Sequence, residues 1–459
     1  MLDDSVMTVP GLSTPLRPYQ QCSVDRTLSE GNTMLALDMG TGKSLTALAV
    51  VLRRQCKRIL IVCPLSVVGS WQNQFAEHVT TPYLFARLDQ GSVRAKVEEA
   101  FKTVSSAARS EQLGVVAINY ESLWREPFGS WALRAGFDCV IADESHRFGA
   151  ANTSISQYMR KLGCTDAVRL CLTGTPFSHS PLSIFGQYRF LDDSIFGRRF
   201  RPFKERYALM GGYQGHQILG FQNQEELQRK FHKHAIVITK EEALPDLPPQ
   251  VFEERVCRFE PKVRRQYDEM VRNFYVEVDG GEVTASNALT KLLRLQQLTS
   301  GHITTDDGES LWVSDHKAKL LADTLEDLTF PVVVFARFVR DLDVIRAVAE
   351  KRKVVYGEVS GRRKDLTPEA KMRPETDILA VQVQAGGVGI DLSRASTSIW
   401  YSMGYSLSDY EQALSRLHRH GQKQSVTHIH LITEGSVDRT VIRALAARKE
   451  VIQYILDRK

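Results

Sequence analysis

The stretch MLALDMGTGKSLTALAV, Met34 to Val50, determines how the rest of the sequence is interpreted. Its first residues, Met34 to Leu37, form an apolar run that is typical of a buried strand. GTGKS, residues 40–44, follows as a glycine-rich turn that leads into a helix with leucines on one face. The stretch therefore predicts a strand, a tight turn and a helix in direct succession.

The chemistry of this turn is that of a phosphate-binding loop. Glycines allow backbone N–H groups to close around phosphate oxygens, and the helix N-terminus adds a partial positive charge. Lys43 can reach the β- and γ-phosphates, and the Ser44 hydroxyl can bind Mg²⁺. A strict GxxxxGK[ST] pattern is not met, because its first glycine would fall at Leu37, so the turn alone specifies only a nucleotide site. The candidate residues of this loop are Gly40, Thr41, Gly42, Lys43 and Ser44.

The composition is that of an ordinary globular protein. The chain has 459 residues, of which 43% are hydrophobic and 25% charged, and this length predicts two or three domains. The net charge of +5 permits a nucleic-acid partner but does not by itself indicate one. Global disorder is excluded by the same figures.

The cysteines and the N-terminus indicate the compartment. No CxxC pair is present, and Cys63, Cys139 and Cys171 lie in apolar, strand-like runs, so we expect reduced core residues rather than zinc ligands or disulfides. No apolar run reaches membrane-spanning length, and the N-terminus is acidic where a signal peptide would be basic. We therefore expect a cytoplasmic protein without a membrane anchor.

Two parts of the chain show short apolar runs that alternate with helical segments, and a different pattern separates them. We expect residues 1–180 and 316–459 each to form a parallel sheet covered by helices on both faces. Residues 181–315 are expected to form a mostly helical insertion and linker, with LPDLPPQ (residues 244–250) as an extended turn point. The predicted fold class is α/β, with ligands at the carboxyl ends of the strands.

A pair of carboxylates follows one of the predicted strands. Asp143 and Glu144 come directly after the apolar run that ends in VIA, about a hundred residues after GTGKS. In an enzyme with a phosphate loop, the first acid holds Mg²⁺ and the second orients and deprotonates the attacking water. In this order after the loop, the pair predicts nucleotide hydrolysis.

With these residues in place, the chain resembles helicase superfamily 2 and, within it, the Swi/Snf family of DNA translocases. The resemblance covers nearly the whole chain and keeps the order of the family's motifs. The matching stretches are LRPYQ, LDMGTGKS, CPLSVVGSW, DESH and LTGTP in the first half, and VVVFARF, QAGGVGIDL and QALSRLHRHGQ in the second half. The resemblance implies two RecA-like lobes with a helical insertion between them, ATP and Mg²⁺ as cofactors, and double-stranded DNA as partner.

The resemblance also assigns roles to single residues. The catalytic group would be Lys43, Asp143, Glu144, Arg416 and Arg419, with Ser44 and Asp143 at the metal. Beyond the phosphate loop, the nucleotide contacts would be Gln20, Gly389, Asp391 and Gln412. Gln412, Arg416 and Arg419 are spaced i, i+4 and i+7, which predicts one helical face from which both guanidinium groups point at a single target. The arginines would reach the nucleotide across the cleft between the lobes and neutralise charge on the transferred phosphoryl group.

The expected DNA contacts are carried over in the same way. They are Ser66, Asn119, Tyr120, Arg337 and the range Gln384 to Gly387. Several stretches depart from the family's usual residues. Phe177 to Ser180 and Tyr405-Ser406 put the details of the coupling between ATP and DNA in doubt. Leu37-Asp38 is expected to change helix-capping or phosphate-loop contacts without abolishing the site, and Ile236 to Ile238 replace a usual arginine pair.

Three further features have a structural and a functional interpretation. Trp71 and Phe75 are spaced for one helical face, where core packing is the expected role. His428 and His430 share one strand face, but no third metal ligand is in register, so surface or packing histidines are expected rather than a metal site. The basic and aromatic run at residues 198–207 suits either phosphate contact or a solvated amphipathic helix.

Other functions remain open at this stage. A strand-separating DNA or RNA helicase of the same superfamily is the nearest alternative, against which HRHGQ and the long middle insertion argue. A scaffold without hydrolysis would be expected to have lost Lys43, Glu144 or the arginine pair, and all are present. A motor coupled to a nuclease is a further alternative, but the sequence has no separate region of the size of a nuclease domain. We expect a compact motor without histone-reading domains, of bacterial or phage type and associated with the nucleoid or the host cytoplasm, and its protein partner is not predicted.

Overall fold

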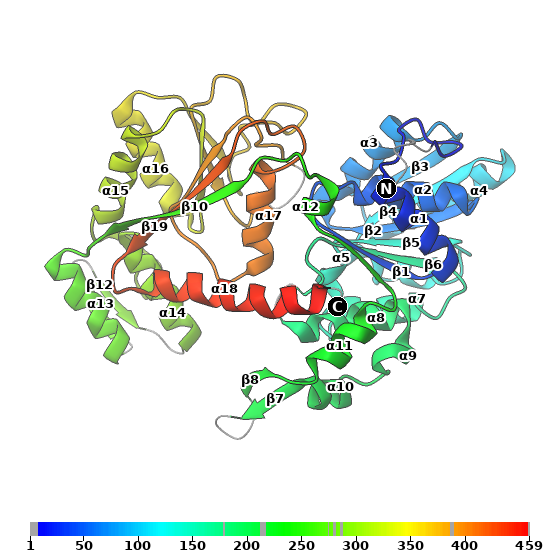
Figure 1. The fold of residues 1–459 in the computed structure, drawn as a ribbon, viewed down its shortest axis with the longest axis horizontal. Helices are drawn as coiled ribbons and strands as arrows, with labels where there is room; N and C mark the ends of the chain where they lie inside the picture. The colour runs from blue at the N-terminus through cyan, green and yellow to red at the C-terminus, as the bar shows by residue number, and fades with distance from the viewer. Residues whose placement is uncertain are drawn as a thin grey trace. The chain divides into compact units, whose positions relative to one another are not determined.

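The computed structural model describes the chain in seven segments, residues 8–177, 180–211, 217–273, 275–278, 281–284, 288–385 and 390–457 (Figure 1). The chain folds into two compact units. Unit 1 contains Met1–Pro245 together with Glu450–Lys459, and unit 2 contains Asp246–Lys449. The chain therefore passes from unit 1 to unit 2 within LPDLPPQ, the stretch that the sequence predicts as an extended turn point.

Unit 1 is built on a parallel sheet of seven strands in the order β3-β4-β2-β5-β6-β1-β9. Its strands are β1 (Thr33–Leu37), β2 (Arg58–Cys63), β3 (Tyr83–Leu88), β4 (Leu113–Asn119), β5 (Cys139–Asp143), β6 (Val168–Leu172) and β9 (Ala235–Ile238). β1, β4 and β5 are buried along their whole length, as the near-continuous apolar runs predict for a sheet covered on both faces. Cys63, Cys139 and Cys171 lie in this buried sheet, so their predicted core positions are confirmed.

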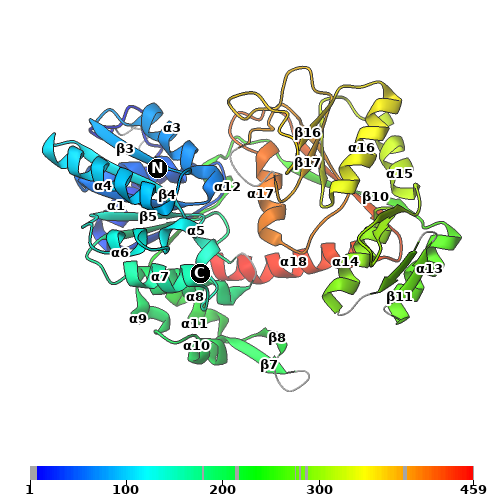
Figure 2. The same ribbon diagram turned by 180° about the vertical axis from the view of Figure 1, so that it is seen from behind.

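Helices lie on both faces of the unit 1 sheet, as the opposite views in Figure 1 and Figure 2 show. They are α1 (Pro18–Glu30), α2 (Lys43–Arg53), α3 (Val68–His78), α4 (Val93–Arg109), α5 (Tyr120–Leu123), α6 (Phe128–Ala132), α7 (Ser154–Leu162), α8 (Ile184–Leu191), α9 (Asp193–Phe196), α10 (Phe200–Tyr207), α11 (Gln224–Phe231) and α12 (Lys240–Ala243). The 3₁₀ turns are η1 (Leu65–Val67), η2 (Ser145–Phe148) and η3 (Pro181–Ser183). β7 (Ala208–Gly211) and β8 (Gln217–Phe221) form a separate antiparallel hairpin.

Side-chain caps fix where several of these helices begin. The hydroxyls of Ser92 and Thr153 accept the backbone N–H three residues on, at the starts of α4 and α7. Thr239 caps α12 in the same way, and Glu242 bonds back to the Thr239 N–H to complete a capping box. The start of α12 is therefore determined locally by the TKEE sequence.

Unit 2 contains a parallel sheet of six strands in the order β10-β19-β18-β15-β17-β16. Its strands are β10 (Gln250–Cys257), β15 (Val332–Ala336), β16 (Tyr356–Val359), β17 (Ile378–Gln382), β18 (Thr397–Trp400) and β19 (Val426–Thr433). The helices that begin in this unit are α13 (Pro261–Asn273), α14 (Ala288–Thr299), α15 (His316–Glu326), α16 (Val339–Arg352), α17 (Leu407–Leu417) and α18 (Val437–Leu456). Two antiparallel hairpins complete it, β11 (Tyr275–Val278) with β12 (Gly281–Thr284) and β13 (His302–Thr304) with β14 (Ser310–Trp312).

The two parallel sheets confirm the α/β fold class with two RecA-like lobes and a largely helical region between them. The range 181–315 is less purely helical than expected, because it adds β9 to one sheet and β10 to the other. Residues 181–245 of this range belong to unit 1, and the remainder belongs to unit 2. Boundaries at residues 180 and 315 stay predictions of the sequence.

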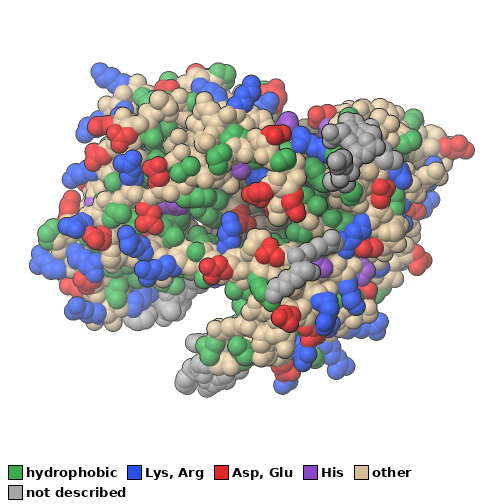
Figure 3. Space-filling model, viewed as in Figure 1, with side chains coloured by type: hydrophobic (Ala, Val, Ile, Leu, Met, Phe, Trp, Pro, Cys, Tyr) green, Lys and Arg blue, Asp and Glu red, His purple; other side chains and the backbone are tan. Residues whose placement is uncertain are grey.

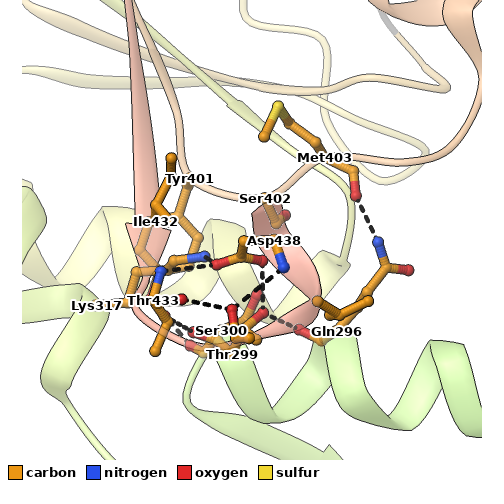
Figure 4. A network of polar contacts seen from close by, with 12 residues as sticks. Gln296, Thr299, Ser300, Lys317, Tyr401, Ser402, Met403, Ile432, Thr433 and Asp438 are labelled. Atoms are coloured by element: carbon orange, nitrogen blue, oxygen red, sulfur yellow. Dashed lines mark hydrogen bonds and ion pairs between the residues drawn. The ribbon is translucent and has the colours of Figure 1, made fainter. Parts of the chain in front are cut away.

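A buried ion pair lies inside unit 2 (Figure 4). Lys317 Nζ on α15 is 2.8 Å from Asp438 Oδ2 on α18, with side-chain exposures of 1% and 9%. Asp438 also accepts hydrogen bonds from Thr299 Oγ1 and from the Thr433 N–H, both at 3.0 Å. Because each carboxylate oxygen has a donor, the charge is stabilised without water, and the network joins α14, α15, β19 and α18.

Charge is mixed over the visible surface. On the face shown in Figure 3, Lys and Arg side chains are interspersed with Asp and Glu, as expected for a net charge of only +5. No helix among the described residues is long and apolar enough to cross a membrane.

Candidate active site

The phosphate loop connects β1 to α2, as the sequence predicts. Gly40 and Gly42 both have φ of +82°, a left-handed conformation that other residues rarely adopt. Space gives a second reason for glycine at position 42, because a Cβ there would lie 2.3 Å from Gln20 Nε2. Lys43 is the first residue of α2 and Ser44 the second, so both lie where the helix N-terminus presents its free N–H groups.

The Lys43 side chain folds back onto the residues at the start of the phosphate loop. Its Nζ donates to the carbonyl oxygens of Leu37 at 2.9 Å and Asp38 at 3.1 Å. The hydroxyl of Thr41 also donates to Asp38 O, at 2.6 Å, which closes the turn. An ammonium group held in this way lies at the mouth of the loop, where a phosphate oxygen would compete with the carbonyls for it.

Gln20 packs directly on the phosphate loop. Its Nε2 donates to Thr41 O at 3.3 Å, its Oε1 accepts the Arg17 N–H at 2.9 Å, and the hydroxyl of neighbouring Tyr19 donates to Thr41 O at 2.7 Å. Two hydrogen bonds to Thr41 O therefore join the start of α1 to the loop. The role of Gln20 at the adenine stays a prediction, but its contact with the loop places it beside the candidate nucleotide site.

Asp143 ends β5 and is held at both carboxylate oxygens. The Trp71 indole N–H donates to Oδ2, and the Glu144 backbone N–H donates to Oδ1, each at 2.9 Å. Burial raises the pKa of Asp143 to about 7, and the Glu144 carboxylate adds to the rise, while the Trp71 bond and the Lys43 charge oppose it. A divalent cation would favour the charged form of this carboxylate.

Glu144 adopts an unusual backbone conformation next to it. Its φ of 50° and ψ of 50° lie in the left-handed region, which is costly for a residue with a Cβ. Its Oε2 lies 3.4 Å from His146 Nδ1, and that nitrogen is 3.3 Å from Thr173 Oγ1. Thr173 follows β6, the strand between β5 and β1, so DESH and LTGTP are in direct contact. His146 and Thr173 lie in the DESH and LTGTP motifs, but neither is predicted individually as a site residue.

The arginine motif of unit 2 is only partly helical. Gln412 and Arg416 lie in α17, but the helix ends at Leu417, so the expectation of one helical face is wrong for Arg419. Two contacts follow the end of the helix: the His418 ring bonds to Pro248 O at 2.7 Å, and the Gln422 N–H bonds to Arg419 O at 3.0 Å to form a turn. Arg419 is therefore placed by a turn and not by helical periodicity.

Asp391 and Arg419 nevertheless lie side by side. Arg419 Nη1 is 3.8 Å from Asp391 Oδ2, and the Leu392 N–H donates to Arg416 O at 3.1 Å. Burial would raise the pKa of Asp391, but bonds from Ser393 and the charge of Arg419 outweigh it and hold the pKa below its usual value. The structure thus joins two predicted nucleotide-site segments of unit 2, while predicted Gly389 lies outside the described residues.

The candidate DNA contacts differ in exposure. Ser66 in η1 and Gln384 are exposed, and Gly386 and Gly387 lie outside the described residues. Asn119 and Tyr120 are buried, and the Tyr120 hydroxyl donates to Asp143 O at 2.7 Å, so a direct DNA contact by the Tyr120 side chain is a wrong expectation for this structure. Arg337 is half-buried and donates to the side chain of Gln296, which in turn donates to Met403 O (Figure 4).

The two histidines of β19 bear on whether the chain holds a metal cluster. His428 bonds to Ser398 Oγ and His430 to the Tyr410 hydroxyl, and both rings are buried in unit 2, so the predicted packing role is confirmed. Within the part of the chain that the structure describes, no group of three or more His, Cys, Asp and Glu side chains is arranged to hold a metal ion by itself.

Comparison with known protein families gives two matches that together cover most of the chain. The SNF2-related domain matches residues 19–302, and the Helicase conserved C-terminal domain matches residues 316–421.

Curated relatives match over almost the whole chain. The DNA repair and recombination protein RDH54 of Saccharomyces cerevisiae is 23% identical over 509 residues, covering 97% of this chain and 52% of that protein. The putative ATP-dependent helicase/translocase YwqA of Bacillus subtilis is 24% identical over 482 residues, covering 97% of this chain and 49% of that protein. The chain thus spans about half the length of these relatives.

Among solved structures, the Sulfolobus solfataricus SWI2/SNF2 ATPase core in complex with dsDNA is similar to this chain. The alignment covers 98% of this chain and 95% of that chain, at 20% identity and a TM-score of 0.45.

Proposed function

Because this chain belongs to the SNF2-related family of ATP hydrolases, we propose that it couples ATP hydrolysis to movement along double-stranded DNA. The observation that carries the proposal is the arrangement at one edge of the unit 1 sheet. β5, β6 and β1 are adjacent and parallel, so the acid pair, LTGTP and the phosphate loop all follow strands that end at this edge. The charge of Lys43 acts on the pKa of Asp143, which supports a common site for the loop and the acids.

The residues of unit 1 supply most of the proposed chemistry. Lys43 and the loop N–H groups bind the phosphates, and Glu144 takes a proton from the attacking water. Ser44 and Asp143 offer hard oxygen ligands which, with phosphate oxygens, fit the preferences of Mg²⁺. When bound, Mg²⁺ would neutralise charge that develops on the phosphate oxygens. Gln20 fixes the loop and is the proposed adenine contact.

The remaining nucleotide residues are proposed from the motifs of unit 2. Arg416 and Arg419 are the candidates that neutralise the transferred phosphoryl group, and Asp391 and Gln412 are proposed to position them together with Gly389. The ion pair between Asp391 and Arg419 supports this pairing, since it holds the guanidinium group without burying it fully. Asp391 would then act through Arg419 rather than by contact with ATP alone.

The DNA partner is proposed from the relatives and from exposed polar positions. The name of RDH54 places that protein in DNA repair and recombination, and YwqA is named a putative helicase/translocase. Exposed Ser66 and Gln384 can donate hydrogen bonds to phosphates, which carry no sequence information, so movement would be independent of sequence. Such contacts weaken as salt rises, because binding releases counterions from the DNA.

Two assays test the proposal together. ATPase rates would be measured without nucleic acid and with single-stranded DNA, duplex DNA, forked DNA and RNA, at low and high salt. We expect duplex DNA to stimulate most and the stimulation to fall steeply with salt. In parallel, the protein should displace the third strand of a DNA triplex but leave a tailed duplex intact. Efficient unwinding of that duplex, or equal stimulation by RNA, would place the protein among the strand-separating helicases.

A further inference from the structure

Trp71 contacts a candidate catalytic carboxylate directly. It lies in the first turn of α3, is 1% exposed, and donates its indole N–H to Asp143 Oδ2 at 2.9 Å. Asp143 Oδ1 accepts the Glu144 N–H, also at 2.9 Å. An ionised carboxylate offers about four lone-pair positions, so each oxygen still has room for a cation or its water. The two bonds therefore fix the orientation of the carboxylate without using up its capacity to bind.

Packing explains the aromatic ring but not the indole N–H. Phe75 lies one turn further along the same helix, is fully buried, and packs against Tyr83 and Phe85 with ring centroids 5.2 and 5.4 Å away. No polar group is needed at that position. A buried tryptophan needs a partner for its N–H, and at position 71 the partner is the acid that follows β5. The core role expected from the spacing is thus confirmed for both residues and is incomplete for Trp71.

A second aromatic residue fixes the backbone of the same acid. The Tyr120 hydroxyl donates to Asp143 O at 2.7 Å, and this side chain is completely buried. Trp71 on α3 thus holds the carboxylate, while Tyr120 on α5 holds the main chain. The main chain and the side chain of Asp143 are therefore held by separate aromatic residues.

We propose that Trp71 is a positioning residue for Asp143, whose N–H keeps the carboxylate oriented for the metal ion that accompanies ATP. The proposal rests on the proposed role of Asp143 in holding Mg²⁺. Without the indole N–H, only the Glu144 N–H holds the carboxylate, so its orientation is less restricted and must be fixed when the ion binds. The effect should appear in metal-dependent binding and not in the affinity for metal-free ATP.

Trp71→Phe removes the donor and keeps an aromatic ring. The affinity for ATP would be measured by calorimetry with excess Mg²⁺ and with EDTA, in the Glu144→Gln background so that no hydrolysis occurs. We expect the gain in ATP affinity on adding Mg²⁺ to fall about tenfold, as for the loss of one charge-assisted hydrogen bond. The affinity in EDTA should stay unchanged. In protein that retains Glu144, the Mg²⁺ concentration for half-maximal ATPase should rise by a similar factor.

Phe75→Leu is the matched control, because it disturbs the same helix and leaves the indole in place. It should lower the melting temperature and leave the Mg²⁺-dependent gain intact. Asp143→Asn should abolish the Mg²⁺-dependent increase in ATP affinity. The double variant Asp143→Asn with Trp71→Phe should behave like Asp143→Asn alone, because both substitutions act through the Asp143 carboxylate. The proposal would be overturned if Mg²⁺ raised the ATP affinity of Trp71→Phe as much as that of the parent protein. It would also be overturned if Phe75→Leu reduced this Mg²⁺-dependent increase as much as Trp71→Phe does. If Mg²⁺ fails to raise ATP affinity in protein with Trp71 intact, the proposed metal site is itself wrong.

Discussion

The backbone N–H of Lys240 donates to Asp38 Oδ2 at 2.8 Å, and this bond ties the phosphate loop to the segment by which the chain leaves unit 1. Asp38 lies between β1 and the GTGKS turn, while Lys240 is the first residue of α12. Burial raises the pKa of Asp38, and the Lys240 N–H is the main opposing contact. The departure from the family at Leu37-Asp38 thus has a structural result: the aspartate anchors a helix that is 202 positions away in the sequence.

Asp38→Ala should loosen α12 more than it loosens the sheet. The Lys240 N–H would lose its acceptor. An unsatisfied buried donor costs about 1–3 kcal/mol, and because this bond is only partly buried we expect the lower end of that range. We expect the Lys240 amide to exchange hydrogen about tenfold faster, measured by hydrogen–deuterium exchange. Asp38→Asn keeps an acceptor oxygen and should change the rate far less. Equal rates in all three proteins would show that this bond carries no stability.

Lys43→Ala and Glu144→Gln should both abolish ATP turnover, but by different routes. The lysine substitution removes a charge that binds the phosphates, so ATP affinity should fall. The glutamine is isosteric and leaves the phosphate contacts in place, so ATP should remain bound without being hydrolysed. Equilibrium ATP binding alongside steady-state ATPase distinguishes the two, and an equal loss of affinity would contradict the assigned roles.

Arg416→Ala and Arg419→Ala should lower kcat by about 10³-fold or more while ATP affinity changes little, because their interaction develops mainly in the transition state. Asp391→Asn removes the partner of Arg419 and should give a smaller fall in kcat in the same direction. The measurement is DNA-stimulated kcat beside equilibrium ATP affinity. A variant with unchanged kcat removes that residue from the site.

Lys317→Met should strongly destabilise unit 2. The substitution leaves Asp438 as an uncompensated buried charge, at a cost of about 3–5 kcal/mol. Urea unfolding followed by a probe in unit 2 gives the value. Lys449→Met is the matched control, because its pair with Glu411 spans 3.5 Å with 61% and 30% of the side chains exposed, and such pairs contribute about 0–1 kcal/mol. Similar losses in both variants would mean that the buried network does not stabilise the unit.

Glu358→Gln should destabilise unit 2 in a pH-dependent way. Burial would raise the pKa of Glu358, but hydrogen bonds from Arg362, Ser360, Tyr356 and Arg346 outweigh it and lower the pKa to about 2. The folded pKa is thus below the unfolded one, so the stabilisation is complete above about pH 4.3 and is lost as pH falls toward 2. Urea midpoints from pH 7 downward should show the two proteins converging at the acid end. A constant difference would assign the effect to packing.

Sequence patterns predicted the parts of this fold that depend on local information. The strand, turn and helix around GTGKS, the acid pair after β5 and the core cysteines all follow from apolar runs and punctuating glycines. β9 and β10 could not be found in this way. β9 is an apolar run of only four residues, too short to distinguish a strand from part of a helix, and β10 is largely exposed at the edge of its sheet and lacks the apolar run of an interior strand.

The errors at the candidate site have a similar origin. The spacing of Gln412, Arg416 and Arg419 predicts a continuous helix, whereas the helix ends early and His418, just beyond it, bonds to Pro248, a residue 170 positions away. Tyr120 looks like a surface residue after a strand, but its hydroxyl is taken up by Asp143 O. Contacts between distant segments carry no signature in a single sequence.

The left-handed backbone of Glu144 has a consequence for how this chain responds to selection. Glycine at that position would adopt φ of 50° without steric cost, so Glu144→Gly would relieve strain while removing the proposed base. Selection for stability alone would favour relief of this strain, whereas selection for turnover would retain the proposed base. The strain at position 144 thus records what the chain gives up in robustness to remain a catalyst.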